Sequence, residues 1–163
     1  MAIVIRGKTK CALCGTLLRD GDEVISFPAF VANQLDPLWR FSDAAFHSTC
    51  FQEDPLAKRV DRRYEEFRNH VGPGHRMCVV CKREITDPDD YFSVGHLTED
   101  PEHPLYCYNY VQAHRSCLPR WSERSQVAKL IAALKNSGAW GGPALDFLLN
   151  ELNSHKSNAD ASQ

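Results

Sequence analysis

The residues best suited to chemistry in this chain are eight cysteines and histidines that form two sets of four with the same spacing. Both sets follow the pattern C-x2-C-x32-H-x2-C, and every member of the second set lies 67 residues after its counterpart. Thiolates and imidazole nitrogens at such spacings are the tetrahedral ligands that Zn2+ prefers. The pattern therefore predicts two structural zinc ions, bound by Cys11, Cys14, His47 and Cys50 and by Cys78, Cys81, His114 and Cys117.

A Cys3His set fills all four zinc positions with protein side chains, whereas catalytic zinc keeps one position for water. We therefore expect a structural role and no enzymatic activity. A disulfide framework is the alternative, but the sequence begins with no basic and apolar signal segment and has no run that could cross a membrane. We expect a reducing compartment, cytoplasmic or, in a eukaryote, nuclear, and no membrane partner. Cys107 is expected to be a free thiol, with a spare-ligand or redox role as the alternatives.

Length and composition agree with two small metal-stabilised modules. The 67-residue period divides the 163 residues into two units of a size that commonly needs a metal or another cross-link to fold. Hydrophobic residues make up 43% of the chain and charged residues 25%, which is typical of a globular protein. The formal net charge of −2 provides no overall basic field for nonspecific binding of DNA or RNA.

Matching strands are predicted around each ligand set. Thr16–Leu18 and Glu23–Phe27 are predicted to form a β-hairpin about the turn Asp20-Gly21. In the second copy, Asp87–Asp90 replaces that turn and precedes a predicted strand at Tyr91–Val94. Two further strands are predicted at Leu38–Phe41 and Leu105–Tyr108.

A helix is predicted to carry the second ligand pair of each set. Ser42 and Asn109 occupy equivalent positions, and both residue types are favourable N-caps. Residues three apart share one helical face, so we expect the histidine and the last cysteine of each set to point at one ion from the helix. A knuckle, a hairpin and a ligand-bearing helix predict an α+β, treble-clef-like fold for each module.

Three more helices are predicted beyond the ligand sets. Amphipathic stripes follow Asp54-Pro55 and Ser122, and we expect them to be core, with an exposed partner groove as the alternative. A helix at 143–155 carries a leucine face that could cap the core or dock a partner or a second copy. The predicted domains are 1–72 and 73–140 for the two modules with their trailing helices, 141–155 for the C-terminal helix and 156–163 for a disordered tail.

The first ligand set resembles the poly(ADP-ribose) polymerase-type zinc finger. The strings that carry the likeness are Cys11-Ala12-Leu13-Cys14 and Phe46-His47-Ser48-Thr49-Cys50-Phe51, with His114-Arg115-Ser116-Cys117-Leu118 in the second copy. The 32-residue gap is slightly longer than is usual for that family, and LIM-type treble-clef fingers share the Phe-His-x2-Cys-Phe ending. The resemblance implies recognition of DNA ends or breaks through basic residues that contact phosphates and an apolar platform that stacks on bases.

The charges support nucleic-acid binding only in part. Candidate phosphate contacts are Arg6, Lys8, Lys10, Lys82 and Arg83. Basic residues on the helix after the first finger alternate with Asp61, Glu65 and Glu66, which predicts a solvated face of mixed charge. Acidic residues within 87–90 and 99–102 would repel phosphates from the second module. The first module could therefore meet nucleic acid while the second meets protein.

Two catalytic interpretations stay open as minor alternatives. A treble-clef metal nuclease would use His96, His103 and Asn109, and a RING-type ubiquitin ligase would interleave its eight ligands, whereas two complete sets follow one another here. The sequence favours a non-enzymatic zinc-binding interaction module or adaptor in a larger intracellular assembly, with a protein partner. The alternative is a DNA-binding protein that recognises ends or breaks. The oligomeric state stays open.

Overall fold

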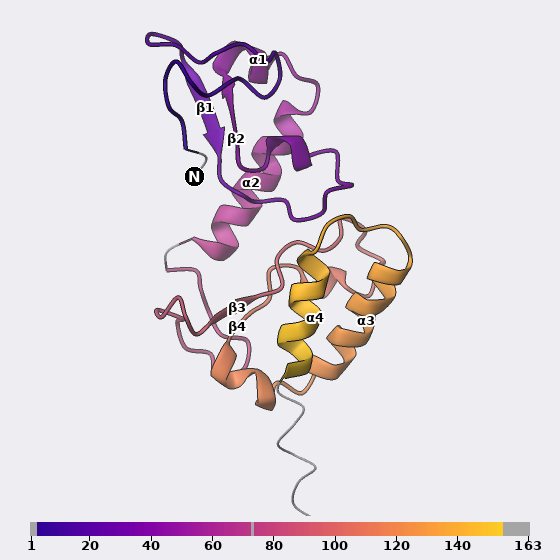
Figure 1. Cartoon of the computed structure of the whole chain (residues 1–163). Helices are drawn as coiled ribbons and strands as arrows, with labels where there is room; N and C mark the ends of the chain where they lie inside the picture. The colour runs from indigo at the N-terminus through magenta and orange to yellow at the C-terminus, as the bar shows by residue number, and fades with distance from the viewer. Residues whose placement is uncertain (1–2, 73, 155–163) are drawn as a thin grey trace, which may run out of the picture. The chain divides into compact units, whose positions relative to one another are not determined.

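A computed structural model describes residues 3–72 and 74–154, and the chain divides into two compact units, 1–68 and 69–163 (Figure 1). Each unit contains one two-stranded antiparallel sheet, helices and one cluster of cysteines and a histidine, so the fold is mixed α and β. The predicted tail, 156–163, lies outside the described residues. The predicted boundaries at 72/73 and 140/141 stay predictions.

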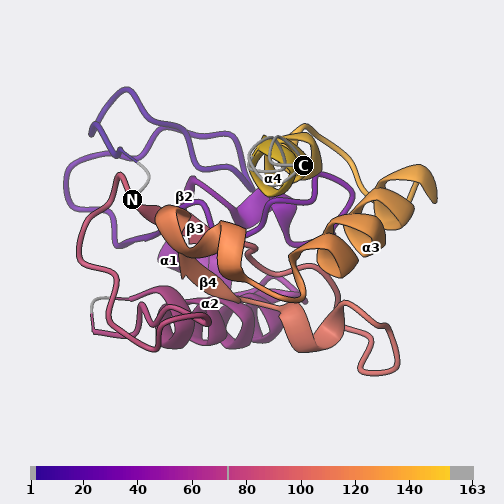
Figure 2. The ribbon, with the colours of Figure 1, turned by 90° about the horizontal axis from the view of Figure 1, so that it is seen from below.

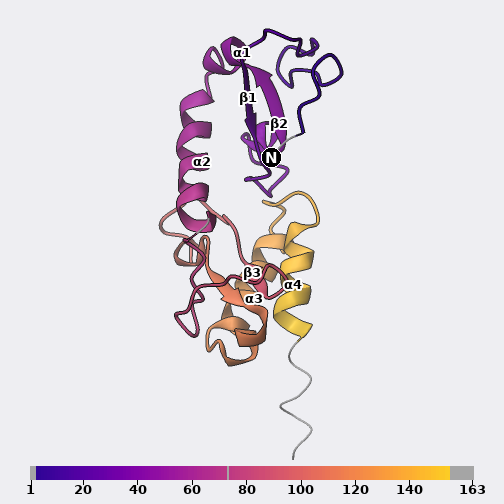
Figure 3. The ribbon, with the colours of Figure 1, turned by 90° about the vertical axis from the view of Figure 1, so that its left-hand side faces the viewer.

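The first unit is a small sheet covered by a long helix. Its strands pair with Phe27 opposite Ala44 and Val24 opposite His47. Figure 3 shows the long helix α2 running alongside this sheet. The elements of the unit are β1 (Val24–Phe27), the 3-10 helix η1 (Trp39–Phe41), β2 (Ala44–His47), α1 (Ser48–Gln52) and α2 (Ala57–Val71), whose last three residues belong to the second unit.

The core of the first unit is aromatic. The ring of Phe27 lies 5.2 Å from that of Phe51 and 5.1 Å from that of Tyr64 on α2, measured between centroids. Phe41 and Phe46, both fully buried, lie 5.5 Å apart. Such ring pairs contribute about 0.5–1.5 kcal/mol beyond the burial of their area. Helix α2 is thereby fixed to the sheet that ends in His47.

The second unit repeats this plan and adds a helix. Tyr91 lies opposite His114 and Ser93 opposite Gln112 in its sheet. The elements are β3 (Tyr91–Ser93), the 3-10 helix η2 (Tyr106–Tyr108), β4 (Gln112–His114), the 3-10 helix η3 (Arg115–Arg120), α3 (Arg124–Asn136) and α4 (Ala144–Ser154).

The 67-residue repeat extends to single backbone hydrogen bonds. Three first-unit bonds around the C-x2-C knuckle have counterparts between the equivalent residues of the second unit. The matching bonds run from Cys11 N to Thr16 O and Cys78 N to Arg83 O, from Gly15 N to Cys11 O and Lys82 N to Cys78 O, and from Ala12 N to Ala45 O and Val79 N to Gln112 O, all at 2.8–3.0 Å. The two units therefore share one framework around their ligand sets.

The predicted hairpin within residues 16–27 is wrong, because β1 pairs with β2. Leu17 instead forms a bridge to Lys10 within the knuckle. The physical reason is burial: pairing with β2 brings the rings of Phe27 and Phe46 to 6.3 Å of each other in the core, whereas Thr16 and Leu17 are exposed. The Asp20-Gly21 turn connects the knuckle to β1.

The predicted strands at 38–41 and 105–108 are also wrong, since both segments contain 3-10 helices. The histidine ligands then lie on strands and not on helices: His47 ends β2 and His114 ends β4. Asp43 and Tyr110, at equivalent positions, have positive φ values of 54° and 59° and turn the chain from each 3-10 helix into the strand.

Ser42 and Asn109 do not cap helices but hold loops. The Ser42 hydroxyl accepts the amides of Phe30 and Val31 at 3.0 and 3.1 Å. The Asn109 side chain accepts the amides of Leu97 and Thr98 at 2.8 and 3.2 Å and donates to the Thr98 carbonyl at 2.7 Å. Each side chain thus fastens a loop to the turn before a ligand-bearing strand.

The predicted trailing helices and the C-terminal helix are confirmed as α2, α3 and α4. Val60 on α2 and Val127 and Ile131 on α3 are fully buried, so the apolar stripes are core. Leu145 and Leu152 of α4 join the core cluster of the second unit. Helix α4 packs beside α3, and Figure 2 views α4 along its axis. The leucine face of α4 therefore belongs to the core.

Asn109→Ala is expected to lower the free energy of unfolding of the second unit by about 1–3 kcal/mol, because two half-buried amides and a carbonyl lose their partner. Chemical denaturation of the zinc-loaded chain measures this change. Asn136→Ala, at an exposed position at the end of α3, is the control and should change stability by less than about 0.5 kcal/mol. Equal effects of the two substitutions would contradict the loop-holding role.

Candidate metal centres

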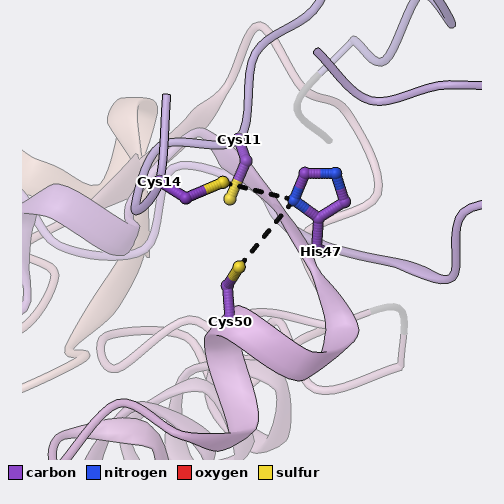
Figure 4. Close-up of side chains that lie close together, drawn as sticks. All are labelled: Cys11, Cys14, His47 and Cys50. Carbon is purple, nitrogen blue, oxygen red and sulfur yellow. Dashed lines mark hydrogen bonds between the residues drawn. The ribbon is translucent and has the colours of Figure 1, made fainter. Parts of the chain in front are cut away.

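The structure brings the eight predicted ligands together as two clusters of four. In each cluster the three sulfurs and one histidine nitrogen all lie within 4.8 Å of one another. Figure 4 shows the first cluster, in which Nδ1 of His47 lies 3.5 Å from Cys14 Sγ and 3.8 Å from Cys50 Sγ. In the second, His114 Nδ1 lies 3.4 Å from Cys81 Sγ. Both clusters could hold a metal ion.

Two local structures position the ligands of the first cluster. Cys11 and Cys14 belong to the knuckle, which closes because Gly15 adopts a positive φ of 75° and donates its amide to Cys11 O. His47 ends β2, and Cys50 lies in α1, which begins at the next residue. The bond from Ala12 N to Ala45 O joins the knuckle to β2 at 3.0 Å. The two ligand pairs therefore face each other.

The second cluster has the same arrangement with one local difference. Lys82 replaces Gly15 and still adopts a positive φ of 60°, a conformation that side chains other than glycine rarely take. Cys117 lies in the 3-10 helix η3, which contains Pro119. The α-helix predicted to hold His114 and Cys117 is therefore absent from the described second unit.

The imidazole of His47 has a partner on each side of its ring. Its Nδ1 faces the sulfurs, while its Nε2 lies 3.4 Å from Oδ2 of Asp22. A histidine that binds a metal commonly donates its other ring N–H to a carboxylate, which fixes the tautomer and orients the ring. Asp22 is thus placed to orient His47 for ligation through Nδ1. The sequence pattern did not single out Asp22, because only folding places it beside His47.

The protonation behaviour of the first cluster fits a divalent cation. The Thr16 hydroxyl, 3.0 Å from Cys14 Sγ, lowers the pKa of the Cys14 thiol to about 6. Burial raises the pKa of the Cys50 thiol to about 11, and the nearby Cys14 and Cys11 sulfurs add to that shift. Without a cation the cluster therefore resists carrying three thiolates. A bound dication removes this obstacle because it deprotonates the thiols that coordinate it.

The two clusters differ in the groups around their sulfurs. In the second, Arg120 donates to Cys117 Sγ at 3.3 Å, and the Cys81 thiolate raises the pKa of Arg83. The residues equivalent to Arg83 and Arg120 in the first unit are Thr16 and Glu53. Two guanidinium groups therefore lie beside sulfurs of the second cluster, whereas the Thr16 hydroxyl and the Asp22 carboxylate contact the first.

The predicted nucleic-acid contacts are divided between the two units. Arg6, Lys8 and Lys10 lie in the first unit and Lys82 and Arg83 in the second. The guanidinium of Arg6 donates to the carbonyls of Arg19 and Asp22, both at 3.0 Å, so it is used within its own unit. Lys8, Lys10 and Lys82 are exposed, and Arg83 lies beside Cys81.

Cys107 lies outside both clusters. Its thiol is exposed and donates to the carbonyl of Pro104 at 3.6 Å. The residue belongs to η2 and not to the strand that was expected, and its role as a free thiol stays a prediction.

Comparisons with protein families, with curated proteins and with solved structures return no match to this chain. Within the part of the chain that the structure describes, no helix is long and apolar enough to span a membrane.

Asp22→Asn is expected to weaken zinc binding at the first cluster by about 10–100-fold, because the uncharged amide orients the His47 ring less strongly. Competition with a zinc chelator of known affinity measures the change. Asp20→Asn is a matched control two residues away on the exposed turn and should leave the affinity unchanged. Wild-type affinity in Asp22→Asn would exclude the orienting role.

Cys14→Ala is expected to disorder the first unit and leave the second folded, because each cluster lies within one unit. Two-dimensional amide NMR of the zinc-loaded variant reads the two units separately. Cys107→Ser should give the wild-type spectrum apart from its neighbours. Loss of both sets of resonances in Cys14→Ala would contradict the independence of the two centres.

Proposed function

We propose that each cluster binds one structural zinc ion and that the chain is a tandem zinc module that acts by binding a protein partner, without catalysis. The observation that supports this best is the convergence of four protein ligand atoms in each cluster. Three thiolates and an imidazole satisfy tetrahedral Zn2+ and leave no position for a reacting water. Zinc in these sites would hold the fold, and the outer surface would do the binding.

The surface offers large apolar side chains on short 3-10 helices and an adjoining turn. Trp39 is 40% exposed and Leu35 is 61% exposed, on a turn where Asn33 Oδ1 accepts the amide of Leu35. At the position equivalent to Trp39, Tyr106 is 45% exposed. An aromatic ring held out by an ordered turn loses little conformational entropy on binding, which suits a recognition surface.

Catalysis by the second unit finds little support in the side chains that a nuclease would use. Asn109 is engaged in holding residues 97 and 98. His103 accepts the amide of Leu105 through Nδ1 at 3.1 Å, which repeats the role of Asp36 toward Leu38. Both side chains therefore stabilise loops, and this structural role accounts for them without catalysis.

DNA binding in the manner of poly(ADP-ribose) polymerase-type fingers is the second candidate. The observation in its favour is that Trp39 and Tyr106 are exposed aromatic rings at equivalent positions of the repeat, as base stacking requires. Phosphate contacts weigh against it, because Arg6 is used within its unit and the acidic residues within 87–90 and 99–102 belong to the second unit. We therefore rank protein binding first.

Titration of the zinc-loaded chain with blunt, gapped and single-stranded DNA and with RNA at low salt separates the two candidates. Protein binding predicts no saturable complex with any of these. A complex that weakens steeply with salt would favour the DNA-binding function and contradict our first choice.

The Trp39→Ser variant should bind a protein partner more weakly than the wild-type chain and still hold its zinc. Arg19→Ser, at an exposed position in the same unit, is the control.

A further inference from the structure

Two arginines in the described part of the chain are buried, and they differ in their surroundings. Arg63 on α2 is 3% exposed, and its guanidinium lies 3.6 Å from Asp36 and 3.9 Å from Glu66. Arg124, the first residue of α3, is 8% exposed. Its Nη1 is fully buried and has no hydrogen-bond partner. None of the ion pairs between the described residues includes Arg124. The charge of Arg63 is therefore balanced by nearby carboxylates, whereas the charge of Arg124 is not.

An arginine remains charged at any physiological pH, so the cost of burying it cannot be avoided by loss of a proton. Burial of a charge without a partner costs several kcal/mol. A water molecule could accept a hydrogen bond from Nη1, but it would leave the positive charge unpaired. The position therefore calls for an anion.

A second unpaired donor lies three residues before Arg124. Trp121 is 6% exposed, and its indole N–H has no acceptor among the described residues. The backbone joins the two residues, since Arg124 N donates to Trp121 O at 3.1 Å. Side chains on a helix lean toward its N-terminus, which directs Arg124 toward the turn that carries Trp121.

The beginning of α3 adds to the positive potential of this place. Glu123, at the N-cap position, makes no side-chain hydrogen bond to the first turn. Its carboxylate lies near the Tyr108 hydroxyl, whose pKa is raised by burial and by that carboxylate. The exposed first amides of a helix carry partial positive charge and favour a negative group. Arg124 and the helix terminus together therefore match a group with a single negative charge.

In the first unit, a carboxylate lies at the position in the repeat that corresponds to Trp121. Trp121 is equivalent to Asp54, and Arg124 is equivalent to Ala57. The Asp54 carboxylate accepts the amide of Leu56 at 2.9 Å and pairs with Arg40 at 2.6 Å. In the second unit that carboxylate is missing, and Arg124 supplies a guanidinium close by in sequence.

We infer that Arg124, the Trp121 indole N–H and the start of α3 form a binding site for a carboxylate that comes from outside the described chain. The acceptor would be an aspartate or glutamate side chain, or the C-terminal carboxylate, of a bound polypeptide. A carboxylate accepts two parallel hydrogen bonds from a guanidinium and carries the single charge that the site lacks. This inference rests on protein binding as the proposed function only for the source of the carboxylate.

The minimal test uses small carboxylates as probes of the zinc-loaded full chain. Acetate, N-acetyl-aspartate amide and N-acetylalanine are titrated at constant ionic strength against chloride, and the side-chain N–H resonances of Trp121 and Arg124 are followed by NMR. We expect saturable shifts with the carboxylates and none with chloride. The tighter of the last two probes identifies an acidic side chain or a C-terminus as the source.

Arg124→Met keeps the length and buries an apolar side chain in place of the charge. It should reduce carboxylate affinity at least tenfold and, in carboxylate-free buffer, raise the Tm, because an unpaired buried charge is removed. Lys129→Met, on the exposed face of α3, is the matched control and should change neither.

Three results would overturn the site: no saturable shift with any carboxylate, equal affinity in Arg124→Met, or tighter binding of inorganic phosphate than of every carboxylate. A lower Tm for Arg124→Met with unchanged probe binding would assign Arg124 a structural role only. Failure of the protein-binding function alone would leave the acetate result intact.

Discussion

Each unit depends on the meeting of two short segments at one point: a knuckle that presents two cysteines, and a strand that ends in a histidine and continues into a short helix with a third cysteine. The ligand atoms lie within 4.8 Å of one another, a separation that suits one shared cation and opposes three unshared thiolates. Zinc-finger peptides bind structural zinc with an apparent free energy of about 10–16 kcal/mol, and this binding drives their folding. That free energy exceeds the stability that a core of this size normally provides.

Around this shared centre the two copies have diverged in the charges beside it. The first has Thr16 against Cys14 and Asp22 against His47, and its Asp54 is held by Arg40. The second has Arg120 against a sulfur, and it replaces the pair of Arg40 and Asp54 with Cys107 and Trp121. A common scaffold with different outer residues therefore gives the two units surfaces of different chemistry.

The sequence predicted the features that follow from local spacing. The ligand sets, the repeat and the helices α2, α3 and α4 follow from residue types at fixed intervals, and the structure brings the ligands together and forms those helices. Strand pairing was wrong because β1 joins a partner beyond the 3-10 helix, a choice made by burial of Phe27 and Phe46 and not by the nearest turn. Ser42 and Asn109 have the composition of helix caps, yet their side chains bind loop amides that are 11 or 12 residues away. The roles of Asp22 and Arg124 depend on tertiary structure. Asp22 contacts His47, and Arg124 is buried without a partner, and no local sequence pattern predicts either fact.

Removal of zinc from the wild-type chain tests the central claim most directly. Native mass spectrometry should count two zinc ions per chain, and a chelator that removes them should abolish the cooperative thermal transition seen by circular dichroism, with recovery when zinc is restored. A chain that holds fewer than two zinc ions, or one that keeps the same melting curve after both are removed, would contradict zinc as the basis of the fold.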